Sequence, residues 1–129
     1  MRNNELSKWL DENLKELRTG DDTRSYVIGV FCEFLNSGNH DMSRESMVLS
    51  YAHAVHVGEF CHFKRCGDWS LWASVCAPGS IETPAVVIEL GMRCYDACDR
   101  IMLRKWPVFN ELAARLPEIT ENTRRLLFR

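Results

Sequence analysis

Apolar residues recur every three to four positions along nearly the whole chain, which is the spacing of amphipathic helices. The clearest stripe lies between Asn4, a candidate N-cap, and Gly20, a candidate stop. It consists of Leu6, Trp9, Leu10, Leu14 and Leu17. A second stripe begins near Asp22 or Thr23 and ends in the sequence NSGNHD. No segment alternates convincingly with the period of two that a half-buried strand requires, so the pattern predicts an all-α protein.

The middle of the chain predicts one long helix followed by a short one. Ser43 is the expected N-cap of the long helix, which we expect to continue to near Gly67. Asp68 is the expected N-cap of a short helix, WSLWASVC.

The last third predicts one further long helix and two short ones. Thr83 and Pro84 have the residue types of an N-cap and a first helical position. Pro107 is expected to start a short helix that Pro117 breaks, and Thr120 to cap the last one. Residues 1–129 are therefore predicted to form a single helical domain, an all-α bundle of four principal helices plus short additional helices.

A row of small residues marks the predicted helix after Thr83. It consists of Gly91, Cys94, Ala97 and Cys98. Small side chains on one helical face let a second helix approach closely, so we expect such an approach here. The six cysteines of the chain are expected to be thiols, and buried ones to behave as small apolar side chains.

Composition narrows the range of partners. The chain has 129 residues, 46% of them hydrophobic and 26% charged, with a formal net charge of −2. This charge favours neither a polyanion nor a membrane surface as a partner. Residues 1–18 carry acidic side chains and lack a continuous apolar stretch, so we expect no secretory signal and a cytoplasmic location.

The stretch HAVHVGEFCH, residues 53–62, carries most of the candidate chemistry. On a continuous helix, His56, Glu59 and His62 fall in the same apolar arc as Val48 and Val55, whereas His53 falls near the polar edge. Buried polar groups of this kind are costly unless they have partners. We expect a buried hydrogen-bond network around Glu59, with no cofactor and no stoichiometric metal.

Two alternatives remain for this stretch. The network can line a ligand pocket whose candidate residues are Tyr51, His56, Glu59, His62, Trp69 and Trp72. Alternatively, Glu59 and His62 bind a metal, since Glu-x-x-His is half of the motif of di-iron bundles. His56 lies six residues before His62, which is about 9 Å along a helix, so these two imidazoles are not expected to share one ion.

The C-terminal segment 108–129 resembles the helix-turn-helix of DNA-binding proteins. The first half matches in Glu111, Leu112, Ala113, Arg115 and Leu116, and the second in Thr120, Asn122, Thr123, Arg124 and Arg125. The resemblance implies DNA binding through the second helix. The segment departs from the pattern at Pro117-Glu118, where a glycine usually makes the turn, and at Arg124, where an apolar residue is usual. A helical hairpin that closes the bundle is the favoured interpretation.

Together these features favour a small, non-catalytic module that binds a ligand or a protein, and a homodimer is the expected assembly. Metal binding through Glu59 and His62 is the first alternative, and DNA binding through residues 108–129 is the second. Neither nucleic acid nor a membrane is the expected partner. The identity of a ligand does not follow from the sequence.

Overall fold

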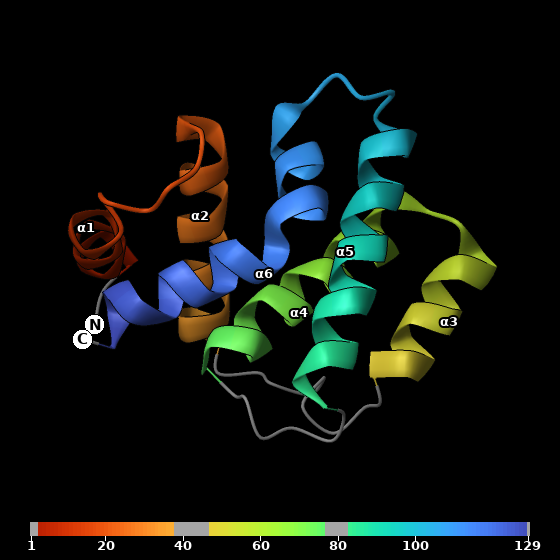
Figure 1. Cartoon of the computed structure of the whole chain (residues 1–129), viewed down its shortest axis with the longest axis horizontal. Helices are drawn as coiled ribbons and strands as arrows, with labels where there is room; N and C mark the ends of the chain where they lie inside the picture. Colours follow the sequence, from red (N-terminus) through yellow and green to blue (C-terminus); the bar gives the residue numbers. More distant parts are fainter. Residues whose placement is uncertain (1–2, 38–46, 77–82, 129) are drawn as a thin grey trace.

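The structure, a computed structural model, describes residues 3–37, 47–76 and 83–128. In these ranges the chain forms six α-helices and no strand, so the all-α prediction is confirmed. The helices are α1 (Asn3–Asn13), α2 (Asp21–Ser37), α3 (Met47–Val57), α4 (Phe60–Cys76), α5 (Pro84–Ile101) and α6 (Pro107–Leu127). Figure 1 shows α4 and α5 at the centre, with α3 on one side and α1 and α2 on the other. One cluster of buried side chains takes members from all six helices.

Helices α4 and α5 pack closely at Gly91. A Cβ atom at this position would lie 2.1 Å from Ser70 Oγ and 2.8 Å from Leu116 Cδ2, so only glycine fits without a shift of its neighbours. The Ser70 hydroxyl also donates a hydrogen bond of 2.7 Å to the carbonyl oxygen of Val87. The close approach predicted from the row of small residues is therefore confirmed.

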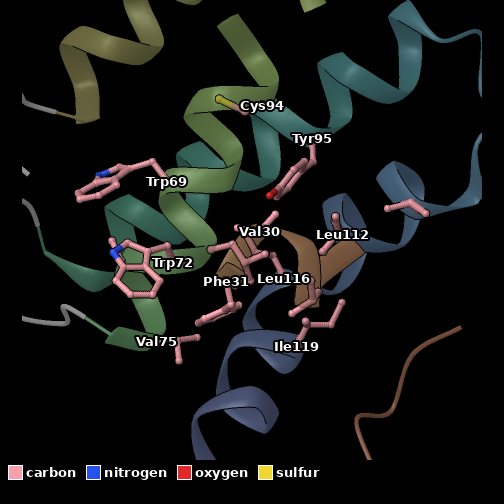
Figure 2. Close-up of a cluster of buried hydrophobic side chains, with 14 of the residues drawn as sticks. Val30, Phe31, Trp69, Trp72, Val75, Cys94, Tyr95, Leu112, Leu116 and Ile119 are labelled. Carbon is pink, nitrogen blue, oxygen red and sulfur yellow. The ribbon is translucent and has the colours of Figure 1, made fainter. Parts of the chain in front are cut away.

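The core between α2, α4 and α6 is built on large aromatic side chains. Trp72 of α4 stacks on Phe34 of α2, with ring centroids 5.6 Å apart, and Trp69 lies 5.8 Å from the same phenylalanine. Figure 2 shows both tryptophans with Phe31, and with Leu116 and other apolar residues of α6. Burial of each large apolar side chain contributes about 1.5–3 kcal/mol, so this cluster is a major source of stability.

The long helix predicted to run to Gly67 is wrong, because the chain breaks at Gly58. Gly58 has a φ of +74°, a left-handed conformation that suits glycine at a helix C-terminus. Its amide donates to the carbonyl oxygen of Ala54 at 2.8 Å and completes the last turn of α3. Helix α4 then begins at Phe60. The predicted start of the long helix at Ser43 lies outside the described residues.

The buried face of α3 differs from the predicted one. Met47 and Ala54 are buried, whereas Val48 and Val55, which we assigned to the apolar face, are about half exposed at 48% and 53%. Apolar side chains lie around most of this helix, so the sequence pattern alone did not distinguish its buried face.

The predicted boundary at Gly67 and Asp68 is also wrong, since both residues lie inside α4. A Cβ atom at Gly67 would lie 2.9 Å from Tyr95 Cε1, so this glycine makes room for a buried tyrosine ring on α5. Asp68 does not cap a helix: it is buried, and its side chain faces Tyr95.

Helix boundaries nearer the ends are closer to prediction. Thr83 is the N-cap of α5 and Pro84 its first residue, as expected. Residues 107–127 are helical on both sides of Arg115, whose φ of −126° and ψ of 19° are non-helical, so the break predicted at Pro117 is present two residues earlier. Figure 1 shows the change of direction of α6 at this kink, beyond which its second half lies beside α2.

Candidate functional site

The six predicted ligand residues do not form one site. Trp69 and Trp72 are buried in the aromatic core, His56 and Glu59 are exposed, and Tyr51 and His62 are partly buried. Glu59 lies in the short connection between α3 and α4. The predicted buried network around Glu59 is therefore wrong, because the break at Gly58 removes this carboxylate from the buried face of a helix.

A buried network exists instead around Asp68, whose residue surface is 3% exposed. Tyr26 of α2 and Tyr95 of α5 each donate a hydroxyl hydrogen bond to Oδ1, at 2.5 and 2.8 Å. Lys64, one turn earlier on α4, donates to Oδ2 at 2.8 Å. Both carboxylate oxygens are thus satisfied by donors from three helices, which is the condition under which a buried charge is tolerated. We call these four residues the Asp68 network.

Burial dominates the electrostatics of the carboxyl group and the tyrosines in the Asp68 network. It raises the pKa of Asp68, while the charge and hydrogen bond of Lys64 and the two tyrosine hydroxyls act in the opposite direction. Burial, reinforced by the charge of Asp68, raises the pKa values of Tyr26 and Tyr95. The tyrosines therefore remain protonated donors at neutral pH.

Lys64 shows the opposite balance. Burial lowers its pKa, but the charge and hydrogen bond of Asp68 outweigh burial, so the pKa is raised overall. Lys64 is therefore a cation at neutral pH, and its Nζ atom also lies 5.5 Å from the ring centroid of Tyr26. This arrangement fixes a long, flexible side chain between α2 and α4.

A groove of about 290 Å³ lies between α2 and α4, and Lys64 and Asp68 of the Asp68 network form part of its lining. We call it the α2–α4 groove, and its lining residues are Glu33, Phe34, Phe60, Cys61, Lys64, Arg65 and Asp68. It combines two phenyl rings with charges of both signs. None of the six predicted ligand residues lines it.

Sequence reasoning missed the groove because it assigned Asp68 to a helix cap. The pair Lys64 and Asp68 has the i,i+4 spacing of a helical ion pair, which indicates a continuous helix through Gly67. Tyr95 lies beside the small-residue row on α5, and a buried tyrosine hydroxyl needs a partner. These two signals together pointed to a network that connects α4 and α5.

Residues of the helix-turn-helix resemblance serve packing inside the molecule. Thr120 and Thr123 are buried, and each hydroxyl donates to a backbone carbonyl of α6 itself. Asn122 accepts a hydrogen bond from the amide of Arg18, and Arg124 donates to the carbonyl oxygen of Ser74 at 2.7 Å. These four polar side chains make contacts within the molecule, which does not favour their insertion into a DNA groove.

Comparisons with protein-family models, with curated proteins and with solved structures found no match to this chain. Among the described residues, no helix combines the length and the apolar character needed to cross a membrane. A helical fold is compatible with many functions, so function is inferred from the chemistry of individual sites.

Proposed function

We propose that the chain is a non-catalytic helical binding module and that the α2–α4 groove holds a small zwitterionic molecule with an apolar side group. The observation that carries this proposal is the composition of the groove. Phe34 and Phe60 offer apolar contact, Glu33 on α2 offers a negative charge, and Arg65 on α4 a positive one. Lys64 is held by Asp68, so Glu33 and Arg65 are the charges best placed to meet a ligand.

The size of the groove limits the ligand. Pockets for drug-sized molecules measure about 300–1,000 Å³, so a volume of about 290 Å³ suits a smaller molecule such as an aromatic amino acid. Binding without catalysis is supported by the Asp68 network. Its carboxylate oxygens are engaged by protein donors, and the raised pKa values of Tyr26 and Tyr95 disfavour proton transfer near neutral pH.

Three probes that share a phenyl group and differ in their charged groups test the proposal: phenylalanine, phenylacetate and phenethylamine. We expect phenylalanine to bind most tightly, measured by chemical-shift titration. Arg65→Ala should weaken phenylalanine and phenylacetate by up to about fivefold, since an exposed ion pair contributes about 0.2–1 kcal/mol. Glu33→Gln should instead weaken phenylalanine and phenethylamine.

The control is Lys8→Ala on α1, an exposed lysine outside the groove, which should change none of the three affinities. Titrations in which none of the probes shifts the resonances of Phe34 or Phe60 would reject the proposed ligand class. Equal effects of Arg65→Ala and Glu33→Gln on all three probes would also contradict it.

Self-association is a second candidate, favoured by the outer surface of α3. Its exposed apolar residues are Val48, Leu49, Val55 and Val57, and Leu49 is 69% exposed. A second copy of the chain would cover this surface in a homodimer with two-fold symmetry. Leu49→Glu should convert the dimer to a monomer in sedimentation experiments, whereas Leu35→Glu on α2 should not. A monomer at all concentrations of the unmutated protein would exclude the homodimer.

A further inference from the structure

The junction between α3 and α4 gathers three different metal-binding side chains. Glu59, Cys61 and His62 each offer one ligand atom, and these atoms all lie within 4.8 Å of one another. The thiol of Cys61 lies 3.9 Å from Glu59 Oε2. Glu59 and Cys61 are exposed and His62 is partly buried, so an ion can reach all three from solvent.

His53, on the other side of the break, lies outside this group of three but close to one of its members. The ring of His53 on α3 lies edge-on to that of His62 on α4, with centroids 5.1 Å apart and an interplanar angle of 85°. On one continuous helix these residues would be about 13.5 Å apart along the axis. The turn at Gly58 therefore brings together two imidazoles that helical spacing separates.

We propose that Glu59, Cys61, His62 and His53 form a binding site for Zn²⁺. A thiolate, imidazole nitrogens and a carboxylate oxygen are the donors that Zn²⁺ accepts, in sets of four around a tetrahedron. Calcium and magnesium prefer sites made of oxygen ligands, which this set does not provide. The proposal replaces the expectation of a metal-free hydrogen-bond network, because Glu59 is exposed and the buried network belongs to Asp68.

The distances suit an ion after small side-chain rotations. Zinc bonds of about 2.0–2.3 Å place tetrahedral ligand atoms roughly 3.3–3.8 Å apart. The ligand atoms of Glu59, Cys61 and His62, now within 4.8 Å of one another, would have to move about 1 Å closer, which side chains achieve by changing rotamer. His53 lies outside this limit and would also have to turn its ring toward the ion. An ion held by residues on both sides of Gly58 would connect α3 to α4.

His56 and the buried thiols provide matched controls within the chain. His56 is exposed on α3, three residues after His53, and is not one of the four proposed ligands. Cys66, Cys94 and Cys98 are buried in the core, and burial raises the pKa of the Cys98 thiol to about 12. Thiolate ligation that depends on Cys61 is therefore separable from nonspecific binding to other cysteines or histidines.

The test uses the full chain, reduced and freed of metal, titrated with Zn²⁺ against a chromophoric chelator. We expect one ion per chain. Cys61→Ser and His62→Ala should each weaken binding by at least about 100-fold, since even changes outside the ligand set cost about 10–100-fold. His53→Ala and Glu59→Gln should weaken it by at least about tenfold. His56→Ala and Cys32→Ser should leave the affinity unchanged.

Substitution of Co²⁺ for zinc provides the second measurement, because a thiolate ligand produces a sulfur-to-cobalt charge-transfer band. This band should be present in the unmutated protein and in His56→Ala, and absent in Cys61→Ser. Zinc affinity that is the same in Cys61→Ser as in the unmutated protein, or a cobalt complex without the band, would overturn the proposal. Circular dichroism of each variant verifies that it is folded.

Discussion

The carboxylates at the centre of the α3–α4 junction and of the Asp68 network, Glu59 and Asp68, lie within ten residues of each other along the chain. Each is surrounded by groups able to donate to it. At the junction Glu59 is exposed, whereas Asp68 is 3% exposed and accepts from Tyr26, Lys64 and Tyr95. The comparison shows that residue type identifies candidate chemistry, and that burial decides whether it serves the fold or remains accessible to a ligand.

The two regions also differ in what holds them together. The donors of the Asp68 network come from three helices that pack around it, so the network is coupled to folding of the whole core. The junction depends on one turn at Gly58 and on side chains free to rotate. Removal of a side-chain group should therefore lower stability markedly in the Asp68 network and change it little at the α3–α4 junction.

The largest expected effect is that of Asp68→Ala. This change leaves Lys64 and two tyrosine hydroxyls without their acceptor, and removal of one partner of a buried ion pair costs about 3–5 kcal/mol. Lys64 is partly exposed, which places the expected loss toward the lower end. Glu59→Ala at the exposed junction should change stability by no more than about 0.5 kcal/mol. Urea unfolding measures both, and equal losses would end the contrast between the two regions.

The sequence predicted the helical class, the N-cap of α5 and the close approach at Gly91, because each depends on local pattern or on residue size. It did not predict the roles of Gly58 and Gly67. A glycine in a helical pattern can end the helix or make room for a neighbour, and the neighbour of Gly67 is Tyr95, far along the chain. The sequence pattern placed a helix end at Gly67 and the helix interior at Gly58, whereas Gly58 follows the end of α3 and Gly67 lies inside α4. The candidate site was misplaced for the same reason.

The second expected effect is that of Gly67→Ala. The new methyl group would lie 2.9 Å from Tyr95 Cε1, and this fully buried ring has little room to move without loss of its hydrogen bond to Asp68. Overpacking of this kind costs about 1–3 kcal/mol. Gly29→Ala on α2 is the control: nothing lies within 4 Å of its new Cβ atom, and it should be neutral or stabilise the helix by up to about 1 kcal/mol. Thermal unfolding that ranks Gly29→Ala as the more harmful change would show that Gly67 does not serve Tyr95.

The third effect concerns the junction and should be smaller. Gly58→Ala forces a side chain into a left-handed conformation, at a cost of about 1–2 kcal/mol. Nothing lies within 4 Å of the added Cβ atom, so the cost comes from backbone conformation and not from packing. Gly58→Asn should therefore cost less than Gly58→Ala, because asparagine adopts this conformation more readily. A loss of stability that grows with side-chain size would indicate packing instead.

The smallest effect is a difference in alkaline stability that depends on the Asp68 network. The pKa values of Tyr26, Tyr95 and Lys64 are all raised in the folded protein. Above about pH 10 the unfolded chain releases these protons while the folded chain retains them. The stabilisation that the three groups contribute is therefore complete below their pKa values in the unfolded chain, and it is lost as the pH rises through their pKa values in the folded protein.

Each retained proton contributes a slope of up to about 1.4 kcal/mol per pH unit. Tyr26→Phe removes one of the three groups, so its urea-unfolding free energy should fall less steeply with pH than that of the unmutated protein. The range to compare is about pH 9.5–11, which extends about half a unit beyond the ordinary tyrosine and lysine pKa values. Glu59→Gln at the junction should leave the slope unchanged, since Glu59 does not contact these groups. Identical slopes in Tyr26→Phe and in the unmutated protein would mean that the Tyr26 hydroxyl is not held by the buried carboxylate in solution.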